Sequence, residues 1–353
     1  MMQEAAQRLG WAEILTDLLA QRDLNGLQAE WSMEQVMAGS ATPGQIGAFL
    51  VALHAKGTTA AEVATFVDTM LRHAHPFKGG SAAVDTCGTG GDVAGTVNIS
   101  SMAAIVVAAT GQPVVKHGNR AASSRSGSAD VFEALGIPLN LAPDSLEVCL
   151  ERAGITFCFA PVFHPAMKFA GPVRRELGIP TIFNLLGPLA NPAQPASQLV
   201  GVADSRLAPV AAQALQLRGT SALVVRGNDG LDEITTMAST TIWDATGSGV
   251  EEVVIDTADL GVARAAPSSL QGGDAAFNAA IAEAVMRNES TVTAVIDAVC
   301  VNAGAALVAC GATGAGSLGD RLAVGYQRAR AAVADGSAAD TLSTWRKVSQ
   351  SLV

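Results

Sequence analysis

The sequence predicts an α/β protein in which a small all-helical domain precedes a larger domain with a mostly parallel central sheet. Residues 1–76 show only helical periodicity, whereas short β-type runs alternate with helical ones in residues 80–353. A chain of 353 residues is long enough for two domains, and its 49% apolar and 15% charged residues favour a large buried core.

Apolar spacing and capping sequences define the helices of the first domain. From Trp11 to Leu19 the apolar residues recur every three or four positions, which places them on one helical face. Capping-box patterns predict that three further helices begin at Ser32, Thr42 and Thr59. Pro43 strengthens the second of these starts, because proline is favoured at the first helical position.

The second domain is expected to contain six strands with helices between them. The candidate strands are 83–87, 113–116, 156–159, 198–202, 222–225 and 253–255. The candidate helices between them are 100–110, 145–154 and 207–218, and long helices are expected at 277–289, 291–311 and 320–334. Such alternation is typical of a parallel sheet covered by helices on both faces.

Charge and cysteine content exclude several classes of protein. The net charge of −10 and the pI near 4.9 argue against a nucleic-acid-binding surface. The five cysteines are odd in number and show no C-x-x-C spacing, which favours a reduced cytoplasmic protein over a disulfide or zinc scaffold. No secretory signal is expected, and the richest apolar stretches, 103–109 and 303–310, are too short to span a membrane.

A glycine-rich turn is the first candidate site. The run Asp85–Asp92 reads DTCGTGGD and is followed by TVNISS at Thr96–Ser101, so strand, turn and polar helix start come in that order. Glycines allow successive backbone N–H groups to face one anion, and a helix N-terminus adds partial positive charge. This order favours a phosphate or pyrophosphate site; the alternative is a tight strand-to-helix turn with ordinary caps.

A cationic loop is the second candidate. Lys116–Arg120 follows a short β-type run, and hydroxyl side chains continue to Ser128. Lysine suits a phosphate as a point charge and arginine as a fork, so this local cluster could hold an anion in an acidic protein. The alternative is a solvated loop.

Two weaker candidates concern a metal and a carboxylate. Adjacent acids at Asp232 and Glu233 could hold Mg²⁺, which shares its remaining ligands with substrate phosphates; adjacent acids on a surface loop are very common, so this signal alone is weak. The segment from His164 to Lys168, with Arg174 and Arg175 beyond it, could bind a carboxylate or form a solvated basic helix face.

Taken together, these motifs resemble the anthranilate phosphoribosyltransferase family from residue 42 to the terminal helices. The resemblance rests on GTGGD with T-x-N-I-S, then KHGNR with SS and GSAD, then HPAMK with PVRRELG and NLLGPL, then G-x-D-E, all in register. It implies a nucleoside phosphorylase/phosphoribosyltransferase type of fold, a cleft between the domains, and a 165–192 segment that packs on the helical domain. It also implies a homodimer through the helical domains, Mg²⁺ as cofactor, and transfer of the phosphoribosyl group of phosphoribosyl pyrophosphate to the amine of anthranilate in tryptophan biosynthesis.

The resemblance also implies roles for individual residues. Those expected to bind substrate are Gly88, Gly91, Asp92, Thr96, Asn98, Ser100, Ser101, Lys116, His117, Gly118, Asn119, Arg120, Ala121, Ala122, Ser123, Ser124, Ser128, His164 and Arg174. Those expected to be catalytic are Lys116, Asn119 and Arg174, and those expected to hold metal are Ser100, Asp232 and Glu233. Gly187 and Pro188 are expected to shape the acceptor channel. The chain departs from the family pattern at Val93, Ser101 and Met167.

Two other functions remain open on the sequence. The fold could serve another glycosyl transfer, such as nucleoside phosphorolysis or transfer to a different acceptor. Alternatively, a catalytically silent scaffold could bind nucleic acid or a partner, although the acidic pI and the intact KHGNR and Asp232–Glu233 motifs argue against this.

Overall fold

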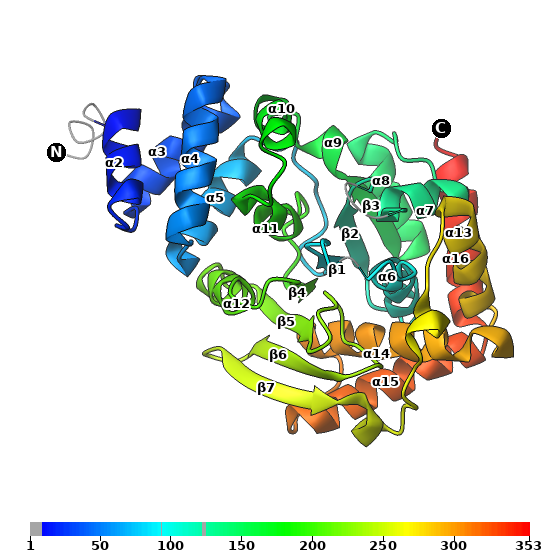
Figure 1. Cartoon of the computed structure of the whole chain (residues 1–353). Helices are drawn as coiled ribbons and strands as arrows, with labels where there is room; N and C mark the ends of the chain where they lie inside the picture. Colours follow the sequence, from blue (N-terminus) through cyan, green and yellow to red (C-terminus); the bar gives the residue numbers. More distant parts are fainter. Residues whose placement is uncertain (1–8, 93, 122–124) are drawn as a thin grey trace.

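A computed structural model describes residues 9–92, 94–121 and 125–353. The chain begins with a bundle of helices at one end of the molecule, coloured blue in Figure 1. Its helices are α2 (Trp11–Leu19), α3 (Gly26–Met37), α4 (Pro43–Lys56) and α5 (Ala60–Arg72).

Capping explains where three of these helices begin. Thr42 and Thr59 form the predicted capping boxes with Gln45 and Glu62, so those two starts are confirmed. The predicted start at Ser32 is wrong. Asn25 forms the capping box of α3, and Ser32 lies buried inside that helix, where its hydroxyl donates to the Ala29 carbonyl.

The second part of the chain is built on a seven-stranded sheet with the order β3-β2-β1-β4-β5-β6-β7. The strands are β1 (Val84–Gly88), β2 (Val114–Gly118), β3 (Ile155–Phe159), β4 (Ser197–Gly201), β5 (Ser221–Gly227), β6 (Ser239–Ala245) and β7 (Glu251–Asp256). The first five are parallel, and β6 and β7 continue the sheet in antiparallel pairing. All six predicted strands are present. The seventh, β6, was not predicted, although its threonine, isoleucine and tryptophan residues are typical of strands.

Helices cover both faces of this sheet. They are α6 (Ile99–Ala109), α7 (Ser128–Ala134), α8 (Pro143–Ala153), α9 (Ala160–Phe163), α10 (Met167–Leu177), α11 (Ile182–Leu189), α12 (Ala208–Leu217), α13 (Ala275–Met286), α14 (Thr293–Ala309), α15 (Leu318–Ala334) and α16 (Ser337–Gln350). The three predicted terminal helices correspond to α13, α14 and α15, and α16 extends the chain beyond them. Short 3₁₀ turns lie at Thr257–Leu260, Pro267–Leu270 and Ser290–Val292.

Alternating side chains divide the interior into two cores. Leu199 and Leu223 face one core with α6, α14 and α15, whereas their neighbours Val200 and Val224 face the other with α12. The second core continues without interruption into the N-terminal helices and includes Ala170 and Val173 of α10. Accordingly, α10 and α11 lie beside α4 and α5 in Figure 1, on the side of the sheet that faces the helical bundle.

One helix corrects an expectation about membrane segments. Ser290–Ala309 is long and apolar enough to cross a membrane, contrary to the expectation from apolar run lengths. However, 83% of its most apolar window is buried, and α14 packs between α6 and α15. Its composition is therefore explained by its place in the core.

Candidate active site

The candidate site lies where β1 and β4 end. From β1 the chain proceeds outward to β2 and β3 on one side, and on the other side β1 pairs with β4, so the strand order reverses between β1 and β4. In open parallel sheets, ligands bind beyond the carboxyl ends of the strands at such a reversal. Gly88 and Gly201 end the two strands, and a Cβ built on either would collide with Asp232, at 2.5 Å from its Oδ2 and 1.5 Å from its carbonyl oxygen respectively.

The glycine-rich turn after β1 adopts a backbone that favours glycine. Gly90 and Gly91 have φ of +65° and +82°, in the left-handed region. The Gly90 N–H donates to Asp232 Oδ2 at 2.7 Å, and Gly91 is exposed at the edge of the site. The turn therefore brings the predicted phosphate loop and the predicted metal ligands together, although they are 142 residues apart in sequence.

The acid pair, with Asp232 buried and Glu233 partly buried, is electrostatically unfavourable when both carboxylates are ionised. Burial and the neighbouring charge of Asp92 raise the pKa of Asp232 to about 7, and burial and Asp232 raise the pKa of Glu233 to about 8. Glu233 Oε1 accepts from the Ser100 N–H at 3.1 Å, which places the three predicted metal ligands side by side. A bound cation would relieve the repulsion between the two carboxylates, so the donor set fits Mg²⁺. Within the described ranges, no three His, Cys, Asp or Glu side chains gather closely enough to hold a metal, so substrate oxygens would complete the coordination.

Lys116 is a buried cation without a carboxylate partner. Its side chain lies near the end of β2 with 1% exposure, and its amine donates to the Thr86 carbonyl oxygen and to Ser100 Oγ at 3.5 Å. Across the part of the chain that the structure describes, Lys116 forms no ion pair, so its charge is available to an anion.

Two histidines face each other on the side of the site toward the helical bundle. The rings of His117 and His164 lie 5.2 Å apart between centroids. Burial and the neighbouring imidazole lower the pKa of His117 to about 3, and burial lowers the pKa of His164, so both rings are neutral at pH 7. The His117 ring also lies close to the backbone of Gly187, which is expected to shape the acceptor channel.

The loop after β2 is only partly placed as expected. Asn119 is exposed, and its Oδ1 accepts from the Arg120 N–H at 2.7 Å. The Arg120 guanidinium, predicted to touch substrate, instead pairs with Asp130 at 2.8 Å and with Glu133 at 2.9 Å and lies over the Phe159 ring. Within the loop, Gly118 and Ser128 lie in contact: a Cβ on Gly118 would meet Ser128 Oγ at 2.3 Å. The predicted contacts Ala122, Ser123 and Ser124, and the departure at Val93, lie outside the described residues.

Arg174 projects from α10 toward α11. Its guanidinium donates to Asn184 Oδ1 at 3.3 Å and lies 5.5 Å from the centroid of the Phe183 ring. Burial lowers its pKa from the ordinary value of arginine, and arginine remains charged at neutral pH. A half-buried cation of this kind can bind a carboxylate with a planar fork. Arg175, next to it, is exposed.

Two predicted substrate-binding residues at the start of α6, Asn98 and Ser101, are enclosed by protein groups in this structure. Asn98 is already engaged, because its amide donates to the Ser126 carbonyl and its Oδ1 accepts from Asn278 Nδ2 at 2.7 Å. Ser101 is 1% exposed, so the structure does not present its hydroxyl to a ligand. Thr96, by contrast, is half-buried in an isolated bridge to Gln271.

Sequence reasoning missed three polar residues that support the site: Asp85, Asn191 and Asn278. The structure buries all three. Asp85 begins the motif that predicts phosphate binding, and Asn191 follows the GPL sequence. An acid within a predicted buried strand, such as Asp85, was therefore the signal that could have indicated a supporting polar residue.

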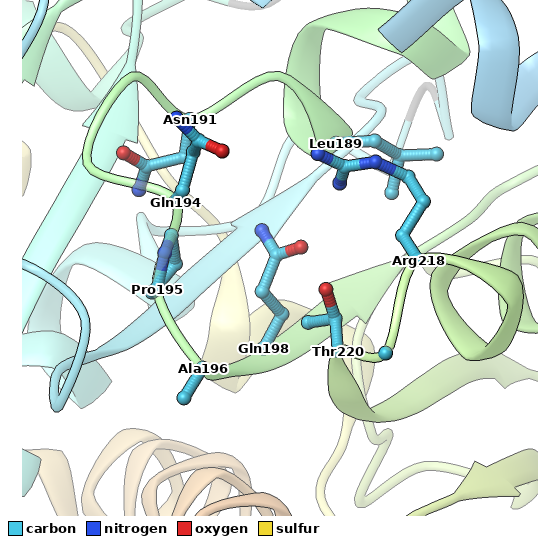
Figure 2. A pocket seen from close by; sticks show the side chains of 9 residues that line it. Leu189, Asn191, Gln194, Pro195, Ala196, Gln198, Arg218 and Thr220 are labelled. Atoms are coloured by element: carbon cyan, nitrogen blue, oxygen red, sulfur yellow. The ribbon is translucent and has the colours of Figure 1, made fainter. Parts of the chain in front are cut away.

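One cavity in the described structure lies away from this site. It has a volume of about 170 Å³ and is lined by residues that precede or flank β4 and β5, which places it at the opposite end of these strands. Figure 2 shows Asn191, Gln194, Gln198, Arg218 and Thr220 around it. The only arginine among its lining residues already pairs with Asp68 at 2.8 Å. Chemistry, and not cavity size, therefore identifies the site at the carboxyl ends.

Comparison with known proteins agrees with this geometry. A glycosyl transferase family model described as the a/b domain matches residues 80–339, and one described as the helical bundle domain matches residues 12–74. Anthranilate phosphoribosyltransferases of Saccharopolyspora erythraea and Salinispora arenicola are each 51% identical, over 343 and 347 residues, covering 97% of this chain and of each enzyme.

Solved structures agree as well. Anthranilate phosphoribosyltransferase from Thermus thermophilus has a TM-score of 0.87 and 36% identity, over 96% of this chain and 99% of that one. The enzyme from Saccharomyces cerevisiae in complex with phosphoribosyl pyrophosphate and Mg shares the fold, with a TM-score of 0.85 and 24% identity over 97% of this chain and 98% of that one. The chain therefore belongs to the anthranilate phosphoribosyltransferase family.

Proposed function

We propose that this protein transfers the phosphoribosyl group of phosphoribosyl pyrophosphate to the amine of anthranilate, releasing pyrophosphate in a step of tryptophan biosynthesis. The observation that carries this assignment is the meeting, at one end of the sheet, of a buried lysine that contacts neutral oxygens, a glycine turn and an acid pair. These groups suit a phosphorylated, metal-bound donor. Family membership at 51% identity over nearly the whole chain supports the same reaction.

The reaction is a displacement at the anomeric carbon. The bond from that carbon to the pyrophosphate oxygen breaks, and its electron pair leaves with pyrophosphate. The lone pair of the anthranilate amine forms the new carbon–nitrogen bond, and the surplus amine proton passes to solvent or to the leaving group. No side chain needs to act as a covalent nucleophile, so the protein contributes alignment and charge stabilisation.

The donor side of the site stabilises the leaving group. Lys116, the Gly90–Gly91 turn and the start of α6 would surround the pyrophosphate and ribose phosphate. Asp232, Glu233 and Ser100 would hold Mg²⁺, which when bound neutralises negative charge on the pyrophosphate. The yeast structure that contains phosphoribosyl pyrophosphate and Mg is consistent with this arrangement.

The acceptor side would orient anthranilate. Arg174 would pair with its carboxylate, and Asn119 would contact the amine side. The neutral rings of His117 and His164, with Gly187 and Pro188, would form an uncharged wall against the aromatic ring. An arylamine is nucleophilic when neutral, so the reaction needs no strong general base in this part of the site.

The larger organisation follows from the same family. We propose a helical domain over residues 1–76, joined by the 165–192 segment, and an α/β domain over residues 80–353, with substrates in the cleft between them. We also propose that the helical domains pair in a homodimer and that the enzyme acts in the cytoplasm. Free thiols at all five cysteines support a reducing compartment.

A fluorescence assay tests the reaction. Purified protein is mixed with anthranilate, phosphoribosyl pyrophosphate and Mg²⁺, and the loss of anthranilate emission is followed. We expect a loss that EDTA abolishes and that a Lys116→Ala variant lacks. Donor binding by calorimetry without anthranilate turnover would instead assign another acceptor, and absence of donor binding would leave only a scaffold.

A further inference from the structure

The seam between β1 and β2 opens toward the site. β1 pairs with β4 along its whole length, Val84–Gly88 with Ser197–Gly201, and β2 pairs with β3 equally fully. Between β1 and β2, however, the register is confined to Val84 and Val114. The two strands that carry the glycine turn and the KHGNR loop therefore separate before they reach the site.

Side chains replace the backbone ladder in this seam. The His117 N–H donates to Asp85 Oδ1 at 3.1 Å, and Asn191 Nδ2 donates to the Val115 carbonyl at 2.8 Å. The Thr86 carbonyl, on the other strand, accepts from the Lys116 amine. Buried backbone groups must be paired, so these side chains allow the strands to separate without leaving polar groups unsatisfied.

Asp85 and Asn191 also bond to each other and reach the acceptor wall. Asn191 Nδ2 lies 2.9 Å from Asp85 Oδ2, and both residues are almost completely buried. The neighbouring Ala190 carbonyl lies 2.9 Å from His164 Nε2. Asn191 also borders the cavity in Figure 2, so it lies between that cavity and the β1–β2 seam.

We propose that Asp85 and Asn191 form a clamp that positions His117 and His164, and with them the acceptor wall. This inference rests on the proposed function. Asp85 must accept through both oxygens, since both face N–H donors, and this favours its ionised form. Burial raises its pKa, and the charge of Lys116 opposes that shift. A carboxylate is therefore required here for its two acceptor oxygens, with Lys116 as the compensating charge.

The test is Asp85→Asn. The new amide would point a donor at the Asn191 amide, so the clamp should open and the histidines should lose their positions. We expect kcat/KM for anthranilate to fall about 10- to 100-fold, because small misplacements near the reacting atoms have effects of that size. The KM for anthranilate should rise more than that for phosphoribosyl pyrophosphate. Adding Asn191→Asp, which restores one donor–acceptor pair, should recover part of the loss.

The matched control is Asp244→Asn, which also removes a buried carboxylate but lies on β6 and bonds to Arg321 and Thr246. It should lower stability without changing the ratio of the two KM values. Wild-type kinetics in Asp85→Asn would overturn the proposal. An equal change in both KM values would also overturn it, because general destabilisation explains such a change. If Asp85→Asn does not fold, Asn191→Ser takes its place; it removes the bonds from Asn191 to Asp85 and Val115 but keeps the bond from His117 to Asp85, so the same rise in the KM for anthranilate is expected at a smaller size.

Hydrogen–deuterium exchange separates this inference from the proposed function. A wild-type protein that does not consume anthranilate would defeat the function. The clamp would still predict faster exchange at residues 114–118 in Asp85→Asn than in Asp244→Asn, and equal exchange in both variants would refute it.

Discussion

The two ends of the central sheet each hold a buried cation, but they treat its charge in opposite ways. At the amino ends of β4 and β5, Arg218 borders the enclosed cavity with a side chain only 13% exposed, and Asp68 neutralises it at 2.8 Å. At the carboxyl end of β2, Lys116 is more deeply buried and bonds only to neutral oxygens among the described residues. The nearby acids Asp232 and Glu233 accept from backbone N–H groups.

This contrast shows what distinguishes a ligand-binding site from a cavity without a ligand. Burying a charge without a partner is unfavourable, so a fold retains such charges where a ligand will complete them. The amino end has a cavity but a compensated charge. At the carboxyl end, among the described residues, Lys116 and the acid pair form no direct ion pair with each other, and both can bind a substrate that carries phosphate and metal.

The largest expected effect comes from removing the buried cation Lys116. Lys116→Met keeps most of the side-chain volume but leaves the pyrophosphate without its buried positive charge. We expect kcat/KM for phosphoribosyl pyrophosphate to fall about 1000-fold, as for other groups that stabilise transition-state charge. Steady-state kinetics at saturating anthranilate measure the loss, and a decrease smaller than about tenfold would contradict the role given to Lys116.

Arg174 tests whether the acceptor side also relies on a cation. Arg174→Ala should raise the KM for anthranilate about 10- to 100-fold, the loss expected for a charge-assisted hydrogen bond. The KM for phosphoribosyl pyrophosphate should stay near its wild-type value. Arg174→Lys keeps the charge but not the planar fork, so its KM for anthranilate should lie between those of wild type and Arg174→Ala. Equal increases in both KM values would mean that Arg174 does not discriminate between the substrates.

The neutral state of the buried His117 makes the stability of the protein depend on pH. The pKa of His117 is near 6.5 in the unfolded chain, whereas in the folded chain it is about 3. Between these values the unfolded state binds more protons, so stability falls as the pH falls. For this group the loss is about 2 kcal/mol between pH 7 and pH 5. Urea unfolding at both pH values should show a smaller decrease for His117→Asn than for wild type; identical decreases would argue that His117 titrates normally.

The smallest effect is expected at the compensated end. Arg218→Ala breaks an ion pair whose acid, Asp68, is 56% exposed. Screening by water limits such a pair to about 1 kcal/mol or less, and kinetics should remain those of wild type. A double-mutant cycle with Asp68→Ala, followed by urea unfolding, measures the coupling. A marked loss of activity would show that the amino end contributes to catalysis after all.

Local signals in the sequence were sufficient for much of the fold. Thr42 and Thr59 begin helices because each hydroxyl accepts from the backbone N–H three residues further along, and this chemistry depends only on neighbours in sequence. Ser32 shows the limit of such signals. The competing cap at Asn25 begins α3 earlier, and the surrounding helices bury the serine.

What the sequence by itself determined is the set of motifs: the glycine turn, the KHGNR loop, the acid pair and the basic helix. Their residue types carry the chemistry, and their order carries the family resemblance. Only the tertiary structure decided which of them meet. Gly90 bonds to Asp232 across 142 residues, Ser100 bonds to Glu233 across 133, and Arg120 turns away to Asp130 and Glu133. The tertiary structure also separated β1 from β2 and placed Asp85 and Asn191 between them. Such pairings depend on the packing of strands that are distant in sequence, and local residue patterns do not specify them.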